Sequence, residues 1–357
     1  MSRSIDFADL PSCPVPVIFL DTHVISSMAK WKMAGEANSI ALNRAKILYG
    51  SILRLVKTKK LICPEVSTWG DEYRLDSKIR EACEMVVVDL AQGISFRSPS
   101  GIENSQMQIA MKAHVQNAES VDYLKEWAHM YHQDPITQLL QKNPFVVRFN
   151  WAEAAESYEE RRERKRRLRD KLTGVKQADS IRTPSFEQKL EEEYQGYING
   201  TYKLGLKPLE RRLVGKSPTP EEGLTAAMTL GMHLVFWEKA EGKPDGISGL
   251  AQFYRSQYLR SVPRIEITAK LWAALAVYLK RAKAKGSDAA DIAMISTVLP
   301  YADFLLLDKT MTNLVRDRLR LDGKYNATVF DMSDCDELLA ELETIEKRES
   351  PLKDVLQ

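Results

Sequence analysis

Cysteines and long apolar runs are both scarce in this chain of 357 residues, and each scarcity excludes a class of protein. The four cysteines are scattered, and no two form a Cys-x-x-Cys pair, so the sequence offers neither a zinc knuckle nor a thioredoxin-like site. So few cysteines are typical of a reducing compartment rather than of a disulfide scaffold. The best apolar run, residues 271–279, is far shorter than the ~20 residues of a membrane-spanning helix.

The chain also lacks an excess of charge of either sign and an apolar leader. Lys and Arg number 51 and Asp and Glu 49, a net charge of +2, which argues against a nucleic-acid binder that is basic over its whole surface. A local basic patch remains compatible with this balance. Acids and prolines occupy the first residues, where a signal peptide would need an apolar segment. We therefore expect a cytoplasmic protein without membrane contact.

Short β-rich apolar runs lie in the first and last parts of the chain. Residues 15–20 are fenced by prolines, and similar runs occupy 61–66, 304–307 and 327–330. Such runs are typical of buried strands in a parallel sheet. Helical spacing is predicted between and after them, over 39–56, 265–281, 288–299 and 337–346. The run MVVVDL at 85–90 fits either a strand or the end of a helix.

The middle of the chain has a different character. Residues 93–262 are polar, rich in Gln, Glu, Lys and Arg, and mostly helical in pattern. We therefore expect an α/β fold whose core comes from two sequence halves, 15–92 and 263–345, with 93–262 as a large, mostly helical insertion.

Acidic residues follow two of the predicted strands directly. Asp21 ends the first apolar run, and Asp308 ends the run at 304–307. Asp288 and Asp291 lie at the start of a predicted helix, three residues apart and therefore on one helical face. Because ligands of open α/β sheets bind at the carboxyl ends of the strands, we expect these acids to converge at one edge of the sheet.

Glu72 adds a further acid to the same predicted edge, in the first turns of the helix after the run at 61–66. Carboxylates packed together repel one another and stay ionised when a cation lies between them. Oxygen ligands without His or Cys favour Mg²⁺ or Mn²⁺ over Zn²⁺. Such an ion can activate water and neutralise charge on a phosphodiester.

The order of these features resembles the PIN domain superfamily of metal-dependent nucleases. The matching segments are FLDTH at Asp21, ICPEVSTWGDE at Glu72, SDAADIA at Asp291 and ADFLLLD at Asp308. The resemblance covers roughly 15–90 and 265–339 and implies a PIN-like central parallel sheet flanked by helices. It also implies that these four acids are the catalytic metal ligands, with Asp288 as an additional ligand.

Two departures from the family pattern bear on activity. His23 stands where PIN domains often have Asn or Ser, and Leu306 and Leu307 precede Asp308 where many members have Thr or Ser. An Asp that follows a strand is also a common helix cap, which gives Asp21 and Asp308 a purely structural alternative.

Several assignments stay open at this point. The second acid could be Asp71 or Glu65 instead of Glu72, and the third could be Asp288 instead of Asp291. Asp303 precedes the strand that Asp308 follows, so we expect it at the opposite end of the sheet.

A basic segment lies inside the helical insertion. Residues 161–171 contain eight basic and two acidic side chains, a net charge of +6. Solvent-exposed helices often carry such charge, but an Arg side chain can also bind a phosphate through two hydrogen bonds. If the segment is helical, one face would offer a set of four basic side chains to nucleic acid: Arg162, Lys165, Arg166 and Arg169.

Together these features predict a Mg²⁺- or Mn²⁺-dependent nuclease, an endoribonuclease in preference to a DNase. The helical region would contact backbone phosphates or a protein partner, and the resemblance implies a possible homodimer. One rival is a catalytically inactive PIN-like scaffold that binds nucleic acid or protein, which the departure at His23 favours slightly. A lower-ranked rival is a phosphatase with Asp21 as nucleophile, although such enzymes carry a second Asp where this chain has His23.

Overall fold

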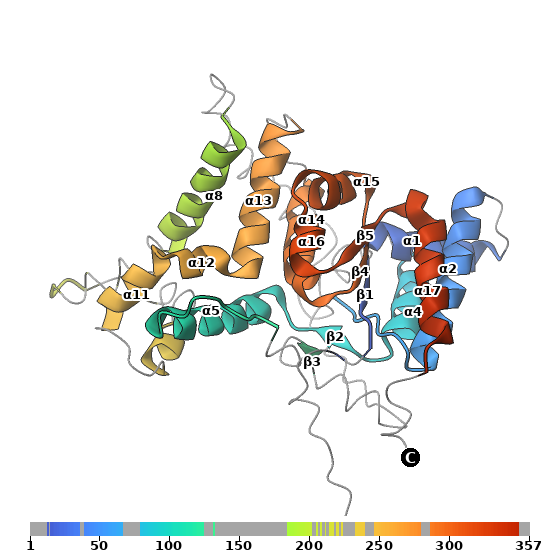
Figure 1. Cartoon of the computed structure of the whole chain (residues 1–357), viewed down its shortest axis with the longest axis horizontal. Coiled ribbons are helices and arrows are strands. Elements are labelled where there is room, and N and C mark those ends of the chain that lie inside the picture. The colour runs from blue at the N-terminus through green and yellow to red at the C-terminus, as the bar shows by residue number, and fades with distance from the viewer. Residues whose placement is uncertain are drawn as a thin grey trace, which may run out of the picture. The chain divides into compact units, whose positions relative to one another are not determined.

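The computed structural model describes most of the α/β part of the chain (Figure 1). The described residues are 13, 15–35, 39–66, 79–124, 131–132, 184–201, 233–239, 246–279 and 286–349, with isolated positions between 205 and 223. The chain divides into two compact units, residues 1–98, 124–178 and 283–357 in the first and residues 99–123 and 179–282 in the second.

A three-stranded parallel sheet forms the centre of the first unit. Its order is β1-β4-β5, and the register pairs Leu20 with Leu306 and Leu306 with Phe330, so the three strands end at the same level. The predicted strands are confirmed at three places: β1 (Ile18–Leu20), β4 (Phe304–Leu306) and β5 (Thr328–Phe330). β1 is buried throughout, and β4 and β5 are buried except at their first residues, Phe304 and Thr328, as expected for a sheet covered on both faces.

Helices flank this sheet on both sides (Figure 1). One group packs together through α1, which contacts α2 and α4, while α17 packs on α2. Its members are α1 (Thr22–Ala34), α2 (Ile40–Lys57), α4 (Arg80–Ala91) and α17 (Cys335–Lys347). On the other side lie α14 (Gly286–Val298) and α16 (Leu321–Tyr325). The short turn η5 (Leu299–Tyr301) leads into β4, α15 (Lys309–Thr312) and η6 (Asn313–Arg318) lie between β4 and α16, and η7 (Met332–Asp334) follows β5. The unit is thus α/β, mostly helical, with a small parallel sheet.

The run at 85–90 is helical and not a strand. Within α4 the buried residues Cys83, Val86, Val87 and Leu90 recur at helical spacing, whereas Met85 and Val88 are exposed. The helix predicted at 39–56 is likewise present as α2, whose first turn is capped by the Ser39 hydroxyl accepting from the Leu42 N–H at 3.2 Å.

The predicted strand at 61–66 is wrong as a continuous strand. The segment makes only isolated parallel bridges, Ile62 with Val17 and Glu65 with Ser95. Pro64 lies between the two bridged residues, and because it has no N–H it cannot continue a hydrogen-bond ladder. Ser95 belongs to β2 (Ser95–Phe96), which pairs antiparallel with β3 (Tyr131–His132).

The second unit is helical where the structure describes it. Its helices are α5 (Pro99–Val115), α8 (Phe186–Thr201), α11 (Gly246–Tyr254), α12 (Gln257–Ser261) and α13 (Pro263–Val277). They share a core in which Trp237, Phe253 and Leu259 are fully buried. Ile265 and Ala269 of α13 belong to the same core, which explains why this helix groups with the second unit, although the sequence pattern predicted residues from 263 onward in the first.

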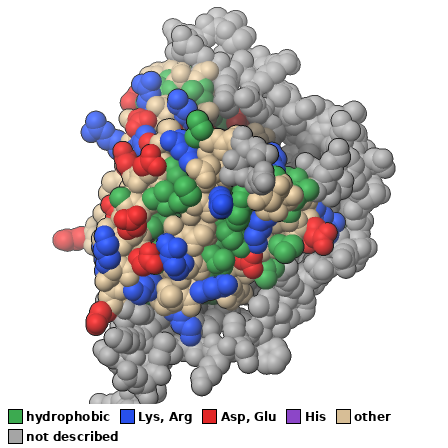
Figure 2. Space-filling view, turned by 90° about the vertical axis from the view of Figure 1, so that its right-hand side faces the viewer, with side chains coloured by type: hydrophobic (Ala, Val, Ile, Leu, Met, Phe, Trp, Pro, Cys, Tyr) green, Lys and Arg blue, Asp and Glu red, His purple; other side chains and the backbone are tan. Residues whose placement is uncertain are grey.

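The four cysteines form no disulfide bond, and no helix in the described part of the chain is long and apolar enough to cross a membrane. On the face of the first unit that carries α2 and α17, the described basic and acidic side chains are interspersed with hydrophobic ones (Figure 2). This face therefore shows mixed charge and no extended basic patch among its described side chains.

Candidate functional site

Three aspartates lie at the carboxyl-terminal edge of the parallel sheet. Asp21 directly follows β1, Asp331 directly follows β5, and Asp308 lies two residues beyond β4. Parallel pairing continues to this edge, because the Asp21 N–H donates to the Leu306 carbonyl and the Leu307 N–H to the Phe330 carbonyl, both at 2.9 Å. The predicted convergence of Asp21 and Asp308 on one edge thus follows from the register of the strands.

Each of these aspartates caps the helical turn that follows it. Asp21 Oδ1 accepts from the Thr22 N–H at 2.5 Å, and Asp308 Oδ1 accepts from the Met311 N–H at 2.8 Å. Asp331 Oδ1 accepts from the Ser333 N–H at 2.5 Å. The structural alternative for an Asp after a strand therefore holds for all three, but the caps at Asp21 and Asp308 engage only one oxygen of the carboxylate.

His23 links the three acids electrostatically. Its Nδ1 lies 2.9 Å from Asp21 Oδ2. Burial lowers the pKa of His23, but the hydrogen bond to Asp21 and the charges of Asp21, Asp308 and Asp331 outweigh it and leave the pKa above its ordinary value of 6.5. The imidazole therefore lies within electrostatic reach of all three carboxylates and supplies a positive charge among them when protonated.

This ion pair predicts a pH-dependent contribution of His23 to stability. Because the pKa of His23 is raised on folding, the contribution is complete below the ordinary pKa of 6.5 and is lost as the pH rises through the raised value. Replacing His23 by Gln should therefore lower the melting temperature more at about pH 5.5 than at about pH 8.5. Calorimetry of both proteins at both pH values tests this, and an equal difference at the two values would contradict it.

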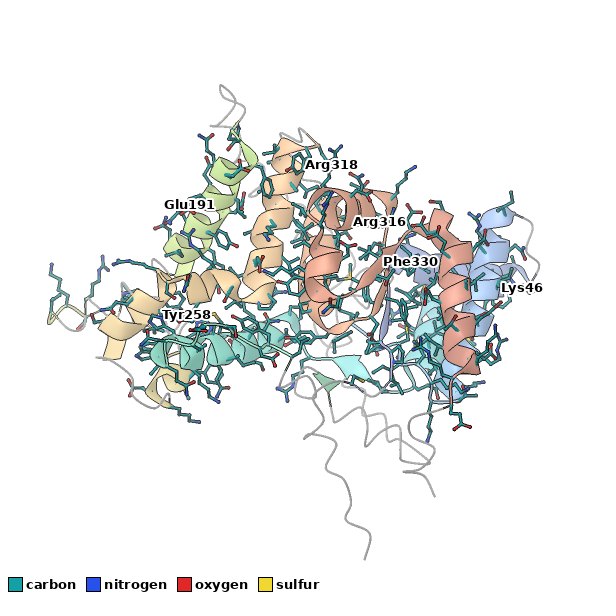
Figure 3. All side chains as sticks on the ribbon, in the orientation of Figure 1. Lys46, Glu191, Tyr258, Arg316, Arg318 and Phe330 are labelled. Atoms are coloured by element: carbon teal, nitrogen blue, oxygen red, sulfur yellow. The ribbon has the colours of Figure 1, made fainter. Side chains whose placement is uncertain are left out.

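Asp331 is a member of this edge that was not among the predicted ligands. Its signal in the sequence was the same as for the other two acids, because it directly follows the predicted strand at 327–330. It is 7 % exposed. Burial raises the pKa of Asp331, but hydrogen bonds from Ser333 and the charges of Arg316 and Lys309 outweigh it, so the pKa lies below its usual value. Asp331 is therefore ionised at neutral pH, close to the charges of Arg316 and Lys309. Figure 3 labels Arg316 and Phe330, the residue that precedes Asp331.

Two further predicted ligands lie on one helix of the same unit. Asp288, which is buried, and Asp291, which is half-buried, lie three residues apart near the start of α14, the helix that leads into β4. Their role at the carboxylate edge stays a prediction. Asp303 lies at the opposite end of β4, as expected, where its carboxylate accepts from the Val17 N–H at 2.7 Å.

The remaining candidates are Glu65, which the structure describes, and a set of residues that lies outside the described part of the chain. Glu65 is half-buried and takes part in the bridge to Ser95. Glu72 and Asp71 lie outside the described residues, as does the entire basic segment at 161–171 with Arg162, Lys165, Arg166 and Arg169. Their roles in metal and nucleic-acid binding stay predictions.

The donor chemistry at this edge suits a hard divalent cation, since it consists of carboxylate oxygens. Asp308 keeps its Oδ2 without a hydrogen-bond partner in the part of the chain that the structure describes. Among those same residues, however, no group of three or more His, Cys, Asp or Glu side chains is arranged closely enough to hold a metal ion. A complete coordination shell would therefore need a ligand from outside the described residues, as predicted for Glu72, or a rearrangement of side chains.

Comparisons with known proteins identify no family for this chain: it matches no protein-family model, no curated protein and no solved structure.

Proposed function

We propose that the carboxylate edge of the first unit is the active site of a Mg²⁺- or Mn²⁺-dependent nuclease that hydrolyses phosphodiester bonds in RNA. One observation carries the proposal: three level, neighbouring parallel strands each run into an aspartate, and Asp21, Asp308 and Asp331 all act on one imidazole. Ligands of open α/β sheets bind at this edge, and titratable groups that act on one another there are candidates for a functional site.

Each group has a distinct role in this proposal. Asp21, Asp308 and Asp331 would hold the metal together with Glu72, and Asp288 and Asp291 are further candidates. A bound Mg²⁺ or Mn²⁺ would supply charge neutralisation to the scissile phosphate and an activated water. Lys309, whose charge reaches Asp331, would attract the phosphate backbone to this edge, whereas Arg316 is held by Asp334 and Asp317.

A second candidate function is a scaffold without catalytic activity. One specific observation favours it, because the His23 imidazolium can neutralise the carboxylate edge without a metal. In that case the first unit would bind RNA or a protein and cleave nothing.

Cleavage of labelled single-stranded RNA with Mn²⁺ separates the two candidates. We expect the wild-type chain to cut RNA with Mn²⁺ and to stop with EDTA, and Asp21→Asn to reduce the rate by at least about 100-fold. Asn can still cap α1, so the loss would reflect charge and not misfolding. Asp336→Asn is the matched control: Asp336 lies on α17 with its side chain 87 % exposed, so this variant should cleave at the wild-type rate.

Metal binding gives the second readout. At a Mn²⁺ concentration of 100 times Kd, binding should stabilise the fold by about 2.7 kcal/mol and raise the melting temperature accordingly. A chain that neither cleaves RNA nor gains stability with Mn²⁺ would exclude the nuclease and leave the scaffold. Cleavage that survives Asp21→Asn would place the activity elsewhere.

A further inference from the structure

The described lining of a pocket in the second unit comes from three helices of that unit, and it includes none of the carboxylate residues named above. Its volume is about 540 Å³, within the usual range for small-molecule sites. Residues of α8, α11 and α12 and of the turn between the last two line it: Gln195, Ile198, Asn199, Ala251, Tyr254, Arg255 and Arg260.

The two arginines of this pocket differ in their charge balance. Arg260 Nη1 and Nη2 donate to the two carboxylate oxygens of Glu191 at 2.7 and 2.8 Å, and its guanidinium lies 5.2 Å from the centre of the Tyr194 ring. Glu191 is labelled on α8 in Figure 3. Arg260 is thereby fixed in place and its charge is balanced. Arg255 has no such acid: its guanidinium has no hydrogen-bond or ion-pair partner among the described residues.

The remaining lining separates a polar rim from an apolar floor. The Asn199 amide, like Arg255, has no hydrogen-bond partner within the described part of the chain. Tyr254 turns its hydroxyl away to His233, with 2.5 Å between the hydroxyl oxygen and His233 Nδ1, so that only its ring is left for the pocket. Ile198 and Ala251 complete the apolar lining.

From this combination we infer that the pocket binds a phosphate-bearing ligand of nucleotide size, with the phosphate on Arg255 and the organic body against Tyr254, Ile198 and Ala251. A guanidinium donates two parallel hydrogen bonds to a phosphate, and the Asn199 amide offers further donors. Inorganic phosphate alone would fill little of the volume and would leave the apolar floor uncovered. The inference is independent of the proposed nuclease, because every residue in it belongs to the second unit.

Binding of adenosine monophosphate to the full chain, measured by calorimetry or NMR titration, tests the inference. Adenosine monophosphate should bind more tightly than inorganic phosphate, and this comparison tests the contribution of the organic body. It should also bind more tightly than adenosine, and this comparison tests the contribution of the phosphate. Arg255→Gln should weaken binding of the nucleotide at least about 10-fold, the range of a lost charged hydrogen-bond pair. Affinity should also fall as salt is raised, since Arg255 is exposed.

Two control variants make the outcome decisive. Lys239→Gln removes an exposed basic side chain of the same unit outside the pocket lining and should leave the affinity unchanged. Asp308→Asn should also leave it unchanged, which separates this pocket from the carboxylate edge. Equal binding by wild type and Arg255→Gln, equal affinity for adenosine and its monophosphate, or no binding of the nucleotide at millimolar concentration would each overturn the inference.

Discussion

Replacing Asp308 by Asn should lower Mn²⁺-dependent RNA cleavage at least about 100-fold while the melting temperature stays the same or rises. The effects on cleavage and on stability differ because Asp308 has two separate roles at this position. Its Oδ1 caps α15 by accepting from the Met311 N–H, and an Asn side chain can accept the same bond. Its charge, in contrast, lies at an edge that also carries Asp21 and Asp331, so removing it relieves repulsion in the absence of metal.

Asp308→Ala provides the comparison that isolates the cap. Alanine removes both the charge and the capping oxygen, so we expect the same loss of cleavage together with a loss of about 1 kcal/mol in stability. Thermal unfolding without metal and single-turnover cleavage with Mn²⁺ measure the two effects on the same preparations. If Asp308→Asn cleaves like the wild type, Asp308 is a cap and nothing more, and the nuclease proposal loses its central residue.

The contrast between charge and cap also explains how far the sequence could predict this site. Hydrophobic runs that end on an acid predicted β1 with Asp21 and β4 with Asp308, because burial on both faces leaves a parallel strand with an unbroken apolar pattern. The same rule applies to Asp331, because it directly follows the apolar run that forms β5.

The pairing of the strands and the partition into units could not be predicted from the sequence. That β4 lies between β1 and β5 depends on contacts between distant residues, such as Asp303 with Val17, which are 286 positions apart. The assignment of α13 to the second unit likewise depends on its packing against α8 and on a shared core, which periodicity alone does not reveal. Pro64 argues against a continuous strand at 61–66, and this local signal is present in the sequence.

Both the fold of the first unit and the position of the proposed site depend on the Leu306 side chain. It is completely buried at the end of the central strand β4, level with Leu20 on one side and Phe330 on the other, and two residues before Asp308. Leu306→Ala would leave a cavity between the two neighbouring strands, and we expect a loss of about 2–5 kcal/mol in the free energy of unfolding. That is a large part of the roughly 5–15 kcal/mol that stabilises a typical protein.

The matched control deletes a similar amount of apolar side chain where it is not packed. Ile40, at the start of α2, is 78 % exposed, so Ile40→Ala should change stability by less than about 0.5 kcal/mol. Urea unfolding followed by circular dichroism measures both variants. Because β4 sets the position of Asp308, Leu306→Ala should also cleave RNA more slowly than wild type at temperatures where it is still folded, whereas Ile40→Ala should not. Equal stability of the two variants would mean that the three-stranded sheet is not the centre of the first unit, and the convergence of the three aspartates would lose its structural basis.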